Sequence, residues 1–152
     1  MEIKGTYTLN APRERVWLLL MNPEALQRAL PGCESLTAAG ENTYEAALKV
    51  GVGAVRGSYN GTVELKDLAN PTSYTMVVEG SGSLGFVRGT GFVELEEQGG
   101  ATLVKVHGEA EVGGLVAGVG QRLLGGVAKI MIDQFFKSMA GQIVSVQAAQ
   151  QQ

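Results

Sequence analysis

The chain has few of the residues that proteins use for metal binding and catalysis. Its 152 residues include one cysteine and one histidine, and only 18% of them are charged and 6% aromatic. One cysteine excludes an internal disulfide and favours a reducing, cytosolic compartment. The 12 basic and 15 acidic side chains are spread out, and no basic cluster is present to bind nucleic acid.

Long apolar runs are also missing. No apolar segment reaches the roughly 18 residues that a membrane-spanning helix needs. The first residues, MEIKGTYTLNAP, lack the apolar core of a signal peptide. We therefore expect a cytoplasmic protein without a membrane span.

The candidate catalytic and cofactor-binding residues lack the partner residues or the secondary structure that such sites need. His107 falls on the outward side of a predicted strand, and Cys33 has no second thiol beside it in the sequence. The glycine string of residues 80–85 matches a dinucleotide-binding pattern, but a strand follows it where that motif needs a helix. We expect no catalytic residue, no metal site and no covalently bound cofactor.

The hydrophobic pattern changes period once along the chain, and this predicts the fold. The first ten residues alternate as a strand does, and prolines mark two short helices before residue 31. Alternation then continues to about Val112, and Leu115 to about Val146 predicts one long helix. The order indicates an α+β helix-grip fold, a curved antiparallel sheet wrapped around the C-terminal helix. We expect one domain over residues 1–146 and a short polar tail over 147–152.

Glycine, with 22 residues, gathers on the predicted inward face of neighbouring strands. Because protein interiors pack densely, missing side chains opposite a helix suggest an apolar ligand cavity. The alternative is that these glycines are bulges and bend points that let the sheet coil. Six more glycines between residues 113 and 126 suggest a mobile entrance to this cavity, or else close packing of the helix on the sheet.

The predicted cavity lining combines inward strand positions with the apolar face of the long helix. It consists of Trp17, Tyr44, Leu48, Val50, Val52, Tyr59, Gly61, Tyr74, Met76, Val78, Gly89, Gly91, Gly108, Ala110, Leu115, Val119, Leu123, Val127, Met131 and Phe135. Tyr44, Tyr59 and Tyr74 are either hydrogen-bond donors to a ligand or core aromatics with hydroxyls at the rim.

Three segments together resemble one family, the G subunit of carbon monoxide dehydrogenase, of the START-like superfamily. They are Val16-Trp17 with Asn22-Pro23-Glu24-Ala25-Leu26 and Leu30-Pro31-Gly32-Cys33; Tyr59-x-Gly61 with Pro71-x-Ser73-Tyr74; and Val112-Gly113-Gly114-Leu115 with Gly120-Gln121-Arg122-Leu123-Leu124 and Gln134-Phe135-Phe136. The similarity covers residues 1 to about 142, and Asn22 stands where the family often has Asp.

The resemblance implies a non-catalytic accessory subunit of a molybdenum-containing carbon monoxide dehydrogenase or related hydroxylase. It implies a non-covalently held quinone, menaquinone-like, or a lipid, and peripheral contact with the inner face of the cell membrane. The short polar end at Gln152 does not suggest the tail-mediated anchoring of some family members. Two other hypotheses remain open: a structural adaptor with a filled core, and a small helix-grip enzyme such as a polyketide cyclase.

Overall fold

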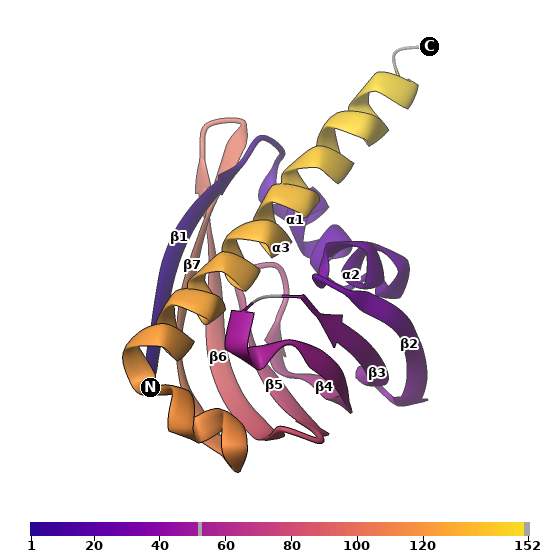
Figure 1. Ribbon diagram of the computed structural model, residues 1–152. Coiled ribbons are helices and arrows are strands. Elements are labelled where there is room, and N and C mark those ends of the chain that lie inside the picture. The colour runs from indigo at the N-terminus through magenta and orange to yellow at the C-terminus, as the bar shows by residue number, and fades with distance from the viewer. Residues whose placement is uncertain (52, 151–152) are drawn as a thin grey trace.

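A seven-stranded antiparallel sheet wraps around one long helix (Figure 1). The computed structural model describes residues 1–51 and 53–150, and the side chains of these residues except 54 and 145–150. The elements are β1 (Glu2–Leu9), α1 (Arg13–Leu20), α2 (Pro23–Ala29), β2 (Cys33–Gly40), β3 (Thr43–Val50), the 3-10 helix η1 (Gly53–Val55), β4 (Gly57–Ala69), β5 (Ser73–Gly82), β6 (Gly85–Gln98), β7 (Ala101–Gly113), the 3-10 helix η2 (Leu115–Val119) and α3 (Gln121–Gln150).

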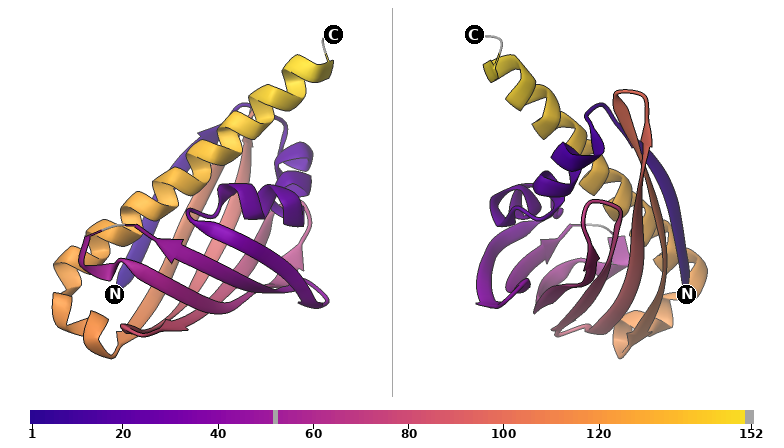
Figure 2. Two further views of the ribbon diagram at one scale, coloured as in Figure 1. Left: turned by 45° about the vertical axis from the view of Figure 1, so that its right-hand side comes forward. Right: turned by 180° about the vertical axis from the view of Figure 1, so that it is seen from behind.

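The strand order is β1-β7-β6-β5-β4-β3-β2. Strands β2 to β7 form a meander in chain order, and the last strand, β7, also pairs with the first, β1. Both views of Figure 2 show α3 crossing the concave face of the sheet. The short helices lie beside the second half of α3, where the side chain of Gln142 donates a hydrogen bond to the carbonyl of Ala25 at 3.1 Å. The predicted helix-grip fold is confirmed.

Local sequence explains where the second short helix begins. The Asn22 side chain accepts hydrogen bonds from the backbone N–H groups of Glu24 and Ala25, at 2.9 and 3.3 Å. Pro23 occupies the first helical position, where its missing N–H costs nothing.

The long helix begins six residues later than the sequence predicts. Leu115–Val119 instead form the 3-10 helix η2, between Gly114 at φ 82° and Gly120 at φ 97°. An α-helix requires negative φ, and glycine adopts positive values without steric cost. The prediction of one continuous helix from Leu115 is therefore wrong, and Gly120 separates η2 from α3. The helix α3 passes through residue 146 and continues to Gln150. The boundary between domain and tail at residue 146 stays a prediction.

Apolar side chains gather in two clusters at opposite ends of the sheet–helix interface. The larger cluster joins α1 and α2 to the second half of α3, with Trp17, Tyr74, Phe135 and Met139 among its buried members. The smaller one contains Val50, Val55, Val116 and Leu124, contributed by β3, η1, η2 and the first turns of α3. The larger cluster forms the main core, and the smaller one surrounds a cavity.

Candidate functional site: an apolar cavity

The cavity measures about 220 Å³ and lies between strands β3 to β7 and the first three turns of α3. The two 3-10 helices η1 and η2 contribute Val55 and Val116 to its wall. Strand register brings the small inward residues together, because Gly61 pairs with Ala46 on one side and with Gly80 on the other. This row of small residues leaves unfilled space below α3.

The inward-facing wall is apolar except for Tyr59. Its hydroxyl donates a hydrogen bond to the carbonyl oxygen of Val55 at 2.8 Å and so ties β4 to η1. Burial raises the pKa of Tyr59, so the phenol keeps its proton at neutral pH. Asn60, Thr62 and Glu79 also border the cavity, but they alternate with inward residues and their side chains lie on the outer face.

The structure brings together seven of the twenty predicted lining residues around this cavity. They come from β3, β4, β5 and α3, as the inward-column interpretation predicted: Leu48, Val50, Tyr59, Gly61, Val78, Val127 and Met131. Val119 packs against the apolar cluster that surrounds the same space. Val52 lies outside the described residues.

Five other predicted residues belong to the packed end of the molecule: Trp17, Tyr44, Tyr74, Met76 and Phe135. Trp17 meets Tyr74 edge-on with ring centroids 5.7 Å apart. Burial raises the pKa of the Tyr74 phenol well above its usual range. Tyr44 and Tyr74 are therefore core aromatics, and because Tyr74 is 1% exposed, its hydroxyl does not lie at the rim that the alternative interpretation supposed.

Two helix-side predictions lie on the surface instead. The Leu115 and Leu123 side chains are 77% and 52% exposed. For Leu115 the reason is the 3-10 helix, which turns this residue outward and places Val116 inward. Leu123 lies on the solvent side of α3, next to Leu124, which lines the cavity in its place.

The predicted glycines divide into two groups. At Gly61 and Gly108 an added Cβ would collide with the carbonyl oxygens of Glu79 and Thr90 on the neighbouring strand, so these glycines permit close approach of strands. At Gly91 an added Cβ would meet nothing within 4 Å. Close approach of strands therefore explains Gly61 and Gly108, whereas Gly91 has open space beside it but does not line the cavity.

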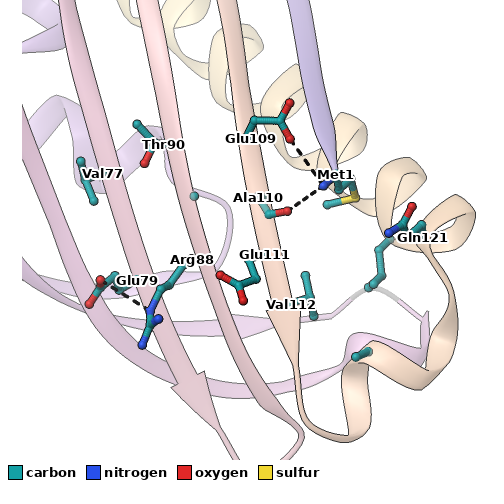
Figure 3. Close-up of a pocket in the computed structure, with 13 residues that line it drawn as sticks. Met1, Val77, Glu79, Arg88, Thr90, Glu109, Ala110, Glu111, Val112 and Gln121 are labelled. Carbon is teal, nitrogen blue, oxygen red and sulfur yellow. Dashed lines mark hydrogen bonds and ion pairs between the residues drawn. The ribbon is translucent and has the colours of Figure 1, made fainter.

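Gly89 and Ala110 border a second depression of about 640 Å³ between strands β5 to β7, η2 and the start of α3 (Figure 3). Met1, Glu79, Val112 and Leu124 line both this depression and the cavity. Figure 3 shows Glu79 and Arg88 directed toward one another and Glu109 toward the amino group of Met1. Both ion pairs measure 3.7 Å, and the three charged side chains are more than half exposed. Glu79, Arg88 and Glu109 in this depression therefore have charged partners, and Glu111 adds a further carboxylate, whereas the wall of the cavity is apolar.

The family follows from comparison of the whole chain. The model of the family described as the carbon monoxide dehydrogenase G subunit (CoxG) matches residues 5–144. The chain belongs to this family. The predicted family resemblance is thereby confirmed.

Solved structures extend this comparison. This CoxG-family protein is 39% identical to a conserved protein from Geobacillus kaustophilus, with a TM-score of 0.93 over 95% of this chain and 96% of that chain. A START superfamily protein from Mycobacterium smegmatis gives a TM-score of 0.75 at 12% identity, over 95% and 98%. A protein from Thermus thermophilus gives 0.73 at 19% identity, over 96% and 99%. The last two similarities show the fold alone. Among curated proteins, none matches the chain.

Sequence reasoning missed several lining residues of this CoxG-family protein. Val55 and Val116 lie in 3-10 helices, whose three-residue period neither the strand pattern nor the helix pattern detects. Leu124 and Ala128 lie on α3 at positions that neighbour the predicted Val127 and Met131. The helix pattern could have identified this second pair.

The described residues of the CoxG-family protein offer no constellation for catalysis at the cavity. His107 is exposed on the outer face, with Nε2 4.0 Å from a carboxylate oxygen of Glu2. Burial raises the pKa of the Cys33 thiol, which lowers its thiolate fraction. No group of three or more His, Cys, Asp or Glu within the described part of the chain could hold a metal. No helix there combines the length and apolar character needed to cross a bilayer.

Proposed function

We propose that this CoxG-family protein binds a compact apolar ring molecule in the cavity and acts as a non-catalytic accessory subunit. The observation that carries the proposal is the unfilled apolar space of about 220 Å³ beside a buried apolar core. An apolar cavity of roughly 150 Å³ in another protein accepts benzene. By the same proportion this cavity has room for about two fused rings.

A quinone head group is the ligand that fits the family best. The two fused rings of a menaquinone-like head group are about the size of the cavity, while the ring substituents and the isoprenoid tail require more space than the cavity offers. We therefore propose that the head group enters and the tail extends beyond η2 and the first turns of α3. The partner in this proposal is a molybdenum-containing carbon monoxide dehydrogenase or a related hydroxylase, at the inner face of the cell membrane.

The two competing functions fit the cavity less well. A structural adaptor needs a filled core, whereas the space below α3 is unfilled. A polyketide cyclase needs acid or base groups inside its cavity, and the inward side chains here provide only the phenol of Tyr59.

Ligand binding is tested with naphthalene as the probe, by titration calorimetry of the purified protein. Ala128→Leu adds three carbons at the cavity wall and should abolish naphthalene binding with a change in unfolding free energy below about 1.5 kcal/mol. The matched control is Ala39→Leu on the exposed edge strand β2, which should bind naphthalene as the wild type does. Unchanged binding by the folded Ala128→Leu protein would reject this cavity as the site.

Identification of the native ligand needs a second experiment. The protein is purified from its own cells and extracted with organic solvent, and the extract is analysed by mass spectrometry. A co-purifying isoprenoid quinone supports the proposal, whereas an empty extract together with no naphthalene uptake favours the structural adaptor. Affinity purification of the tagged protein should also retain the molybdenum-containing hydroxylase subunits.

A further inference from the structure

Among the described residues, Tyr59 is the polar side chain that faces the cavity, and its hydrogen bond has a fixed direction. A tyrosine hydroxyl has a single proton and two lone pairs. In Tyr59 this proton is directed to the Val55 carbonyl oxygen at 2.8 Å. The oxygen atom of Tyr59 is therefore available to a ligand as an acceptor but not as a donor.

No other described side chain at the cavity replaces that donor. The remaining inward side chains are aliphatic, aromatic or thioether groups. Met1 also borders the cavity, but its amino group donates to the Ala110 carbonyl at 2.9 Å and pairs with the exposed Glu109 carboxylate at 3.7 Å (Figure 3). Backbone N–H groups of β4 and β5 are taken up by sheet pairing.

We infer that the cavity prefers a ring that carries a hydroxyl group, a phenol or hydroquinone, over the same ring in its quinone form. The hydroxyl of such a ligand donates to the Tyr59 oxygen and leaves the Tyr59–Val55 bond intact. A quinone has only acceptor oxygens, so it meets the Tyr59 oxygen without a proton between them. This inference rests on the proposed function, because it requires a ring compound in the cavity.

Rotation of the Tyr59 hydroxyl toward a quinone would not remove the difference. The Val55 carbonyl would lose its partner in a part-buried position. Loss of this hydrogen bond at the part-buried Val55 carbonyl offsets what a new bond to the quinone contributes. The preference thus follows from the contact between β4 and η1, and the raised pKa of Tyr59 keeps the proton in place.

The test uses three probes of one ring size: naphthalene, 2-naphthol and 1,4-naphthoquinone. Dissociation constants are measured by calorimetry in a Cys33→Ser background, because a free thiol adds to quinones. We expect 2-naphthol to bind about tenfold more tightly than 1,4-naphthoquinone. Tyr59→Phe should weaken 2-naphthol binding about three- to tenfold and leave naphthalene binding within about twofold. Tyr74→Phe, in the packed core, is the matched control and should leave all three constants unchanged.

The outcomes separate the two proposals. Naphthalene binding together with tighter binding of the quinone than of the naphthol overturns the hydroxyl preference and leaves the ligand cavity standing. An equal effect of Tyr59→Phe on all three probes does the same. Failure of every probe to bind overturns the proposed function and the preference together. If Tyr59→Phe does not fold, the order of 2-naphthol and 1,4-naphthoquinone in the wild-type protein decides.

Discussion

Two glycines on the inner face of the sheet have opposite surroundings. At Gly61 an added Cβ would collide with the Glu79 carbonyl and lie 2.7 Å from the Cα atom of Gly80, whereas at Gly91 it would meet nothing within 4 Å. The first glycine permits close approach of β4 and β5. The second leaves space open above the sheet.

This contrast gives a matched pair of alanine variants. Gly61→Ala forces two hydrogen-bonded strands apart and should lower the free energy of unfolding by about 2 kcal/mol. Gly91→Ala has room for its methyl group and should change it by less than about 0.5 kcal/mol, or raise it. Urea titration measures both, and equal losses in the two variants would contradict the assignment.

At the residue scale, the sequence predicted which side chains face inward better than it predicted where along the groove they lie. Parity identified which strand residues face inward, because side chains alternate strictly and the observed register preserves that alternation. Parity carries no information on the position along the groove. Tyr44 and Tyr59 both lie at inward positions of their strands, yet Tyr44 is part of the core and Tyr59 lines the cavity. That difference depends on where α1 and α2 pack, which no local pattern encodes.

Among the elements, α3 is joined to β1 by two contacts of Tyr7, a ring stack and a hydrogen bond. Tyr7 stacks on Phe136 with ring centroids 4.3 Å apart, and its hydroxyl donates to Asp133 Oδ1 at 2.7 Å. Lys129 donates to the other oxygen of Asp133 at 2.8 Å. Burial and the hydrogen bond to Asp133 raise the pKa of Tyr7 to about 12, while the bonds from Lys129 and Tyr7 lower the pKa of Asp133.

The Tyr7 contact predicts a change in stability at alkaline pH. Because the pKa in the folded protein lies above the unfolded value of about 10, its contribution is complete below pH 10 and is lost as pH rises toward 12. The difference in unfolding free energy between wild type and Tyr7→Phe should therefore shrink between pH 10 and 12. A difference that stays constant over this range, measured by urea titration, would show that the hydroxyl does not contribute through Asp133.

The glycines at the start of α3 are not explained by close packing. An added Cβ at Gly118, Gly120 or Gly126 would meet nothing within 4 Å, and at Gly125 only the Met1 sulfur at 3.9 Å. This removes the packing alternative for these four positions, whereas Gly113 and Gly114 are closely packed against Phe86 and Gly85. The open surroundings favour a cavity entrance formed by the first turns of α3. We expect these turns to open more readily than the part of α3 near Asp133, which is bonded to Tyr7.

Two substitutions test that interpretation of the helix start. Gly126→Ala, at an exposed position in α3, should raise the free energy of unfolding by about 1 kcal/mol and slow the release of bound naphthalene. Gly120→Ala, at φ 97°, should instead lower the free energy of unfolding by about 1–2 kcal/mol. Thermal unfolding and stopped-flow displacement measure the two effects. An unchanged release rate in a stabilised Gly126→Ala protein would place the entrance elsewhere.

For the whole molecule, charge and exposed apolar surface are distributed unevenly. Residues 113–152 carry three basic side chains and one acidic one, while the rest of the chain carries nine basic and fourteen acidic. The same C-terminal region exposes Leu115, Leu123 and Ile130, the last by 44%. Apolar side chains beside basic ones are typical of surfaces that bind anionic membranes.

This distribution predicts how the protein meets lipid vesicles. Binding to vesicles that contain phosphatidylglycerol should be about tenfold tighter than to pure phosphatidylcholine, since each basic side chain near an anionic surface contributes about 1 kcal/mol. The double variant Leu115→Ser, Leu123→Ser should lose most of this binding. Phe92→Ser, exposed on the outer face of the sheet, is the control and should retain it. Cosedimentation shows the result, and equal loss in both variants would contradict this docking face.

The fold could be predicted from the sequence because its elements are long and regular, and because one change of period separates sheet from helix. The cavity could be predicted only as a region. Its two closing elements, η1 and η2, are three and five residues long and have no hydrophobic period of their own. Gly114 and Gly120 adopt positive φ, which turns Val116 inward and Leu115 outward. Glycine content alone does not specify which of two neighbours faces the interior.

A crystal structure of the protein grown with 2-bromonaphthalene tests the central claim most directly, because the bromine atom locates the ring without reference to affinity. We expect one anomalous peak inside the cavity, among Tyr59 of β4, Val78 of β5 and Met131 of α3. Well-ordered crystals without that peak, or with bromine only among the charged side chains of Arg88, Glu109 and Glu111, would contradict the proposal that the space below α3 is a ligand site.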